Sequence, residues 1–209
     1  ILPSDSNGTS AIWAAQRVPD GHVTVVPNVF VLREIDFNDK ENFLYSANIQ
    51  SIAEKNGWWK QGEPFDFTKI YSGGEYHHRY YSGRRWWGAM KIFAPSQNFP
   101  TKYNDWRNDA PYPFSVKPDK DVTLEDVMAV MRTFYEGTEF SLTNGLQSGA
   151  FGNGNRYPVT EGAIKGNWER SIALYRTDYS YILEIDGNTT LPAEVRNTIW
   201  FGPSAAHVT

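Results

Sequence analysis

The stretch Thr123–Gly137, with the sequence TLEDVMAVMRTFYEG, contains the clearest secondary-structure signal of the chain. Its apolar residues follow the i, i+3, i+4, i+7 spacing of an amphipathic helix: Leu124, Val127, Met128, Met131, Phe134 and Tyr135. Thr123 is a favourable N-cap, and Asp126 stands where a capping box places its acidic partner. Gly137 is expected to end the helix.

Segments rich in β-forming residues precede this helix. Ile12–Val18 and His22–Val26 are predicted to form a hairpin, because Pro19-Asp20-Gly21 between them is typical of a turn. Pro27-Asn28 interrupts the second run, which resumes at Val29–Leu32. A proline inside such a run indicates an edge, a bulge or a strand end, so Asn28 is placed at a break in a strand.

Another helix and further strands are predicted on either side of the long helix. Ser46–Lys55 is predicted as a short helix that stops at Asn56-Gly57. After the long helix, Ser171–Ile185 is predicted as a long strand or a strand pair, and Thr198–Phe201 as a final short strand. Strands before and after a small number of helices favour an α+β layered fold.

The region from Trp58 to Pro113 is unusually rich in aromatic residues, glycine and proline. Loops and short elements that wrap over the main body are expected here. We treat residues 1–209 as one domain in which positions of about 58–113 form an insertion-like region.

Composition excludes several classes of protein. The net charge of −4 is mild and no basic stripe occurs, so nucleic acid is not expected as a partner. No apolar run is long enough for a membrane span. Cysteine is absent from the 209 residues, which removes disulfides and a cysteine nucleophile from this part of the protein.

The first residue is Ile1, and we expect a processed or excised segment of a longer protein. The sequons at Asn7 and Asn188 are candidate glycosylation sites and give weak support to a secreted or lumenal, lysosome-like location.

Three local motifs have a structural and a functional interpretation. His77-His78 would point to opposite faces of a strand, which disfavours a shared metal, and no metal or other cofactor is predicted. The glycine-rich loop Gly152–Asn155 lacks the spacing of a phosphate-binding loop and is interpreted as a turn. Trp58-Trp59 and Trp86-Trp87 could stack on sugars, although buried packing is the more frequent fate of tryptophan.

Several short stretches occur in an order that resembles a known family. They are Trp13–Asp20 (WAAQRVPD), Pro27-Asn28, Arg33–Asp36 (REID), Gly62–Phe67 (GEPFDF), Pro113–Asp119 (PFSVKPD), Tyr135–Thr138 (YEGT), Gly152–Pro158 (GNGNRYP) and Ile199–Pro203 (IWFGP). Together they resemble the secreted dipeptidase family of cysteine-type N-terminal-nucleophile (Ntn) hydrolases, which is distantly similar to penicillin V acylase and bile salt hydrolase.

The resemblance implies a four-layer αββα sandwich, incomplete in this chain, and hydrolysis of an amide or peptide bond. The nucleophile of the family is a cysteine freed as the first residue of the mature enzyme, and its α-amine can serve as the base. We therefore expect a companion N-terminal chain or segment that carries this cysteine, and a small peptide as substrate.

Two site residues follow from the resemblance. Asn28 resembles the oxyanion-hole asparagine of the related acylases, and its alternative role is that of a turn or bulge residue. Arg170, in Trp168–Ile172 (WERSI), resembles the arginine beside the nucleophile, and its alternative role is an ordinary ion pair.

Two other functions stay open at this point. One is a catalytically inactive storage or structural homologue that has lost the nucleophile. The other is a carbohydrate-binding protein that uses the tryptophan pairs.

Overall fold

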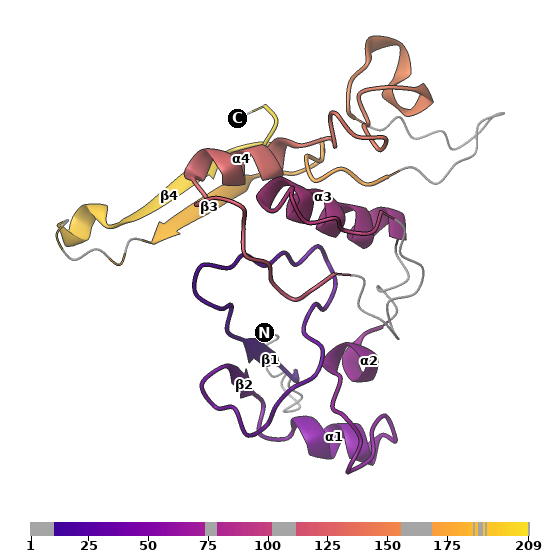
Figure 1. Ribbon diagram of the computed structural model, residues 1–209, viewed down its shortest axis with the longest axis vertical. Coiled ribbons are helices and arrows are strands. Elements are labelled where there is room, and N and C mark those ends of the chain that lie inside the picture. Colours follow the sequence, from indigo (N-terminus) through magenta and orange to yellow (C-terminus); the bar gives the residue numbers. More distant parts are fainter. Residues whose placement is uncertain are drawn as a thin grey trace.

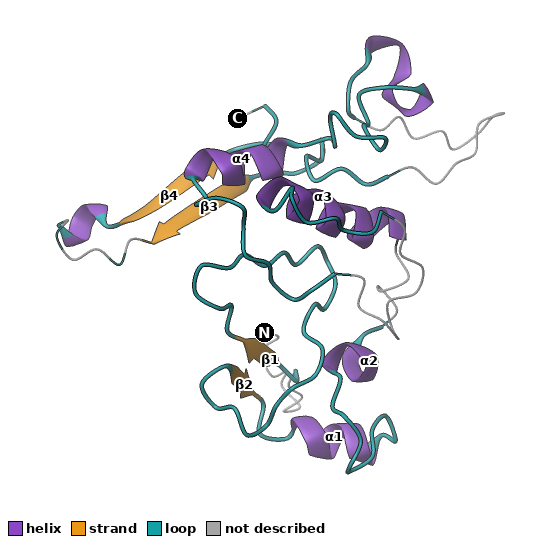
Figure 2. Cartoon of the chain, in the orientation of Figure 1, coloured by secondary structure: helices purple, strands orange, loops and turns teal. Residues whose placement is uncertain are grey.

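The computed structural model describes residues 11–73, 79–101, 112–155, 169–185, 187, 190 and 192–208 (Figure 1). Helices and strands both occur in these residues, as the colours of Figure 2 show. In chain order the main elements are β1 (Ala14–Gln16), β2 (Phe43–Tyr45), α1 (Ile49–Lys55), α2 (Phe67–Tyr71), α3 (Arg84–Phe93), α4 (Leu124–Arg132), β3 (Ser180–Ile185) and β4 (Asn197–Gly202). The predicted α+β class is confirmed, whereas the four-layer sandwich stays a prediction.

The first strand pairs with a segment further along the chain than the local turn suggested. β1 is antiparallel to β2. The expected turn does form, since the amide of His22 donates to the carbonyl of Pro19 (3.0 Å), but the chain beyond it does not return to β1. The predicted hairpin of Ile12–Val18 with His22–Val26 is therefore wrong. Long-range backbone pairing, which no local pattern encodes, selects the partner of β1.

The second predicted run does not form a continuous strand. Val23 makes an isolated antiparallel bridge to Val116. The backbone then turns at Asn28, whose φ of 59° is a left-handed conformation that interrupts strand geometry. The predicted break at Pro27-Asn28 is confirmed. Val29–Leu32 makes no strand in the described chain, and most of its side chains are buried in the core.

The helix predicted from Thr123 forms as α4, with the predicted capping box. The hydroxyl of Thr123 accepts from the amide of Asp126 (3.3 Å), and the Asp126 carboxylate accepts from the amide of Thr123 (3.0 Å). The helix ends at Arg132 rather than at Gly137. Tyr135 has a φ of 64°, which a right-handed helix does not contain.

The aromatic-rich region contains more regular structure than predicted. Helix α1 precedes this region and ends before Gly57 as expected, and that glycine has a φ of 70°. α2 is capped by Asp66, and a π-helical turn at Arg79–Gly83 continues directly into α3. The helix α3 was not predicted from the sequence, because the many tryptophan, glycine and arginine residues of RRWWGAMKIF obscured the helical spacing of Trp86 and Met90.

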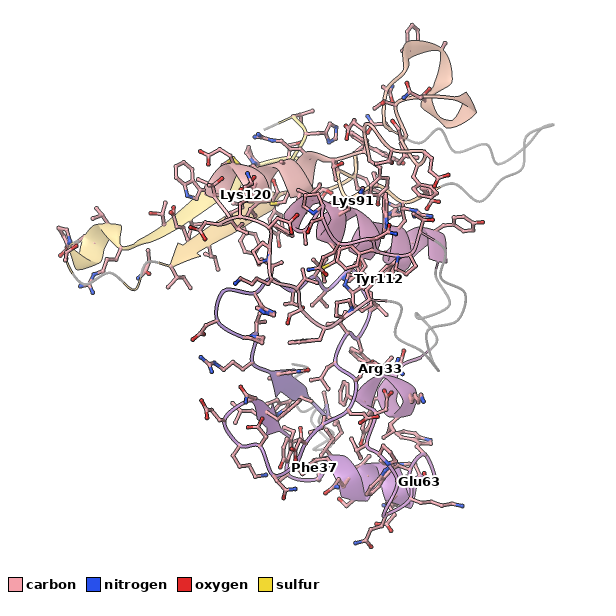
Figure 3. All side chains as sticks on the ribbon, in the orientation of Figure 1. Arg33, Phe37, Glu63, Lys91, Tyr112 and Lys120 are labelled. Carbon is pink, nitrogen blue, oxygen red and sulfur yellow. The ribbon has the colours of Figure 1, made fainter. Side chains whose placement is uncertain are left out.

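Helix α3 supplies the centre of the main hydrophobic core. Trp86, Trp87 and Met90 are buried on it together with Phe99 and Tyr112. Figure 3 labels Tyr112 just below α3, and its ring meets that of Trp86 edge-on at a centroid distance of 5.3 Å. The helix is thereby fixed by apolar packing along most of its circumference.

A short extended segment connects this core to a second one. Val29 and Val31 pack in the cluster around α3, whereas Leu32 and Ile35 belong to the cluster formed with α1 and α2. The segment that begins at Asn28 is therefore held by apolar contacts from both clusters.

The last two strands form a hairpin that extends away from α4 (Figure 1). In its register Ile182 stands opposite Trp200. The strand predicted at Thr198–Phe201 is confirmed, whereas Ser171–Ile185 is a strand only over its last six residues. Within the described part of the chain, no helix has the length and apolarity that crossing a bilayer requires.

Candidate active site

Asn28 projects from the surface at a turn between two buried residues. Pro27 and Val29 are buried, whereas Asn28 itself is exposed. Asparagine tolerates the left-handed conformation seen here better than most residues do, because its short amide can hydrogen-bond locally. The turn therefore presents a side-chain amide to solvent on a backbone that the core holds in place.

Arg85, in the first turn of α3, binds this turn through its guanidinium. Nη1 donates to Oδ1 of Asn28 (2.9 Å), and Nη2 donates to the carbonyl of Pro27 (3.0 Å). Nε donates to the carbonyl of Tyr81 in the π-helical turn (2.8 Å). Burial lowers the pKa of Arg85, but a guanidinium stays protonated in proteins. The asparagine thus lies beside a fixed positive charge.

Arg170 is anchored through its main chain to the same π-helical turn. Its amide donates to the carbonyl of Tyr80 (2.7 Å), and its carbonyl accepts from the hydroxyl of Tyr135. Its guanidinium lies over the ring of Tyr81, with 4.8 Å between Cζ and the ring centroid. The position of Arg170 is therefore set by both backbone and side-chain contacts.

The ring of Tyr81 links the two predicted site residues. The guanidinium of Arg85 lies 4.4 Å from the same ring centroid. Cations are attracted to the face of an aromatic ring, so one tyrosine holds both arginines. The structure thus joins Asn28 and Arg170 in one network, through Arg85 and Tyr81.

An ion pair with little solvent exposure, between Arg84 and Glu169, lies next to this network. Nε of Arg84 lies 3.1 Å from Oε2 of Glu169, in an ion pair rather than an aligned hydrogen bond. The Arg84 guanidinium also lies over the ring of Phe140, 3.3 Å from its centroid. The pair fixes α3 to the residue that immediately precedes Arg170.

Tyr135 packs against α3 at Gly88 and contacts the backbone of Arg170. Its ring contacts Gly88, where a Cβ atom would come within 2.5 Å of Cε1. Burial raises the pKa of the Tyr135 hydroxyl, so that it stays protonated and can donate to the carbonyl of Arg170. Gly88 is therefore a position where the absence of a side chain allows a close approach.

Four members of the network escaped the sequence analysis: Tyr81, Arg85, Tyr135 and Glu169. Tyr135 and Glu169 lie in the stretches YEGT and WERSI but were given no role, and no motif marks Tyr81 or Arg85. Their contacts connect segments that are far apart in sequence. The unusual dipeptide Arg84-Arg85 was the one available signal. The residues that contact these two arginines could not be inferred without knowing that α3 is a helix.

The tryptophan pairs do not form stacking platforms. Trp59, Trp86 and Trp87 are buried, and only Trp58 is exposed, with an exposed fraction of 54%. Trp58 meets the ring of Tyr71 edge-on. This burial removes the paired surfaces on which the carbohydrate-binding interpretation depended.

The glycine-rich loop is a turn, as predicted. Gly152 has a φ of 61°, and the amide of Asn155 donates to Oδ1 of Asn153 (2.9 Å). The histidine pair His77-His78 and the sequons at Asn7 and Asn188 lie outside the described residues.

Comparison with known proteins places the chain among peptidases. It belongs to Peptidase family C69, whose sequence model matches residues 6–209. It is 28% identical over 190 residues to a probable dipeptidase of Latilactobacillus sakei, a match that covers 91% of this chain and 35% of that relative. It is 22% identical over 194 residues to Dipeptidase A of Lactobacillus helveticus, covering 92% and 36%, and 26% identical over 192 residues to a probable dipeptidase of Salmonella dublin, covering 91% and 39%.

The family resemblance drawn from the sequence is confirmed by this match, because C69 is a dipeptidase family with a cysteine nucleophile of the Ntn type. The chain spans about a third of the length of the curated relatives that it matches.

Proposed function

We propose that the protein to which this chain belongs is a dipeptidase that uses an N-terminal cysteine as nucleophile. Membership of Peptidase family C69 supports the reaction class. The chain has no cysteine and covers 35% of its relative from Latilactobacillus sakei, so we assign the nucleophile to a companion segment or chain outside these 209 residues.

In this proposal the cysteine thiolate attacks the carbonyl carbon of a short peptide, and its own α-amine exchanges the proton. The carbonyl oxygen gains negative charge in the tetrahedral intermediate and needs preorganised donors. Asn28 supplies one of them through Nδ2. Arg170 lies beside the nucleophile and contributes positive charge. The complete enzyme would form the αββα sandwich.

The orientation of the Asn28 amide is the observation that carries the proposal. Its oxygen accepts from Arg85, so its two N–H groups are left for another acceptor, and among the described residues none is bonded to them. In an Asx-turn, the usual structural role of a turn asparagine, the side-chain oxygen accepts from a nearby backbone amide, whereas Oδ1 of Asn28 accepts from Arg85. The resulting group is an exposed amide donor beside the fixed positive charge of Arg85.

The test replaces Asn28 in the full-length protein. The left-handed φ of 59° makes a bulky residue such as leucine unsuitable, because the strain would confuse the result. Asn28→Asp and Asn28→Gly tolerate this conformation and remove the amide donor. We expect each to lower kcat for dipeptide hydrolysis by about a hundredfold or more. Asn98→Asp, at another exposed asparagine, is the matched control and should keep full activity.

N-terminal sequencing and intact mass of the purified protein test the nucleophile directly. A mature chain that begins with cysteine, and that loses activity on alkylation of this thiol, supports the proposal. A mature protein without any N-terminal cysteine, serine or threonine would contradict it and would favour the inactive homologue.

A further inference from the structure

We propose that Arg85 is a positioning residue, which orients the amide of Asn28 as an oxyanion donor; this inference rests on the proposed function. Neither the family match nor any sequence motif assigns a role to Arg85. The inference is carried by the three directed hydrogen bonds of its guanidinium and by its place on a buried helix.

The contact with Oδ1 determines which end of the Asn28 amide faces away from the protein. If the amide rotated by half a turn, its NH₂ group would face the guanidinium, and two sets of donors would oppose each other. Arg85 therefore favours the rotamer in which Oδ1 faces inward and Nδ2 faces outward. A preorganised donor of this kind needs no reorientation when negative charge develops on a substrate oxygen.

The contact with Pro27 holds the backbone as well as the side chain. Nη2 binds the carbonyl of the peptide unit that enters Asn28, the residue with the left-handed φ. Asparagine adopts this conformation less readily than glycine does, and the contact with the Pro27 carbonyl helps to hold it. Arg85 thus connects the turn to α3 at two adjacent points.

Arginine is required for this role, because its donors point in fixed directions. Nε and the two Nη groups of the planar guanidinium reach three different acceptors, and its Cζ lies 4.4 Å from the centroid of the Tyr81 ring. A lysine at this position would carry the same charge but could not reproduce the three directed contacts. The charge and the geometry of Arg85 are therefore separable by experiment.

The experiment is a double-mutant cycle in the full-length protein, with kcat and KM for a dipeptide as the readout. Arg85→Gln should lower kcat by about tenfold to a hundredfold with a smaller change in KM, because the amide loses its orientation but is still present. Arg85→Lys, which keeps the charge and most of the stem, should lose a similar factor. The double variant Arg85→Gln with Asn28→Gly should be no slower than Asn28→Gly alone.

Arg132→Gln is the matched control, since Arg132 also donates from Nε to a backbone carbonyl, that of Ala206 (2.9 Å), but lies on α4. It should keep the full kcat. Thermal unfolding of every variant separates loss of activity from loss of fold, and Arg85→Lys answers the question if Arg85→Gln fails to fold.

Each outcome has a definite meaning. A full kcat for both Arg85 variants, or losses that multiply in the double variant, would overturn the positioning role while the function of Asn28 stands. A full kcat for Asn28→Gly would instead show that the proposed oxyanion role of Asn28 is wrong, and the role of Arg85 would fall with it.

Discussion

The guanidinium of Arg84 lies 3.1 Å from the carboxylate of Glu169, and the two side chains have exposed fractions of only 3% and 14%. This ion pair joins α3 to the segment that begins at Glu169, in the second half of the chain. Because Arg170 follows Glu169 directly, the pair also determines where its backbone meets the π-helical turn. Stability and the geometry of the candidate site therefore depend on the same contact.

Glu169→Gln should destabilise the full-length protein by about 3–5 kcal/mol, because it leaves the buried charge of Arg84 without its partner. Urea-induced unfolding measures the effect. The matched control is Asp20→Asn, which removes one of the two partners of Arg17 in an exposed ion pair and should change little. Equal unfolding midpoints for Glu169→Gln and the wild type would contradict the importance of the buried pair.

Gly88→Ala should destabilise the protein by about 1–3 kcal/mol, because an added Cβ atom cannot fit beside a buried ring. The new atom would lie 2.5 Å from Cε1 and 2.8 Å from Cδ1 of Tyr135. Thermal or urea unfolding reports the loss. Gly187→Ala is the control, because a Cβ atom there meets nothing within 4 Å. If both substitutions were neutral, the packing of Tyr135 on α3 would be looser than described.

Tyr135→Phe keeps the packed ring but removes the donor to the carbonyl of Arg170. An unsatisfied buried carbonyl costs about 1–3 kcal/mol, and we expect a loss of stability of this size. Burial raises the pKa of Tyr135, so the hydroxyl stays protonated and the loss should be the same from pH 6 to about pH 9. Tyr175→Phe, at an exposed tyrosine, serves as the control.

Asp126 should stabilise the protein at neutral pH, and this contribution should be lost in acid. Its pKa is lowered, first by the hydrogen bond from Lys120 and then by that from the backbone amide of Thr123. A carboxyl group with a depressed folded-state pKa stabilises the fold above its unfolded pKa of about 3.9, and this contribution disappears as the pH falls through the folded-state value. The wild type should therefore be more stable than Asp126→Asn at pH 7, and the difference should shrink towards pH 3.

Lys120→Met removes the first of these causes and should weaken the pH dependence. Unfolding midpoints of the three proteins across this pH range provide the measurement. A difference between the wild type and Asp126→Asn that stayed constant down to pH 3 would contradict the prediction.

The helix α4 shows what a short segment can specify. The cap at Thr123 and the apolar spacing as far as Met131 lie within one stretch, and both were correctly interpreted. The predicted end of the helix was wrong, because the backbone is already extended at Thr133 (ψ of 140°). Phe134 and Tyr135 instead pack with Leu142 and Ala173, which the local pattern does not contain.

Only part of the candidate site could likewise be predicted from the sequence. Asn28 and Arg170 were identified by their resemblance to family motifs, and the break at Asn28 followed from Pro27 and the interrupted strand. The resemblance did not indicate that Arg85 and Tyr81 connect them, since Arg85 and Asn28 are 57 positions apart in the chain.

The sequence by itself determined the α+β class, the cap of α4, the glycine end of α1, the strand at β4 and the family. The two helix ends depend on interactions between neighbours in the chain, which act in any environment. The class, the strand and the family followed from composition and from the order of short motifs along the chain. Only the tertiary structure decided the partner of β1, the helix α3 and the network from Asn28 to Arg170. Those features depend on contacts between distant segments, and such contacts are fixed only when the packed core brings their backbones together.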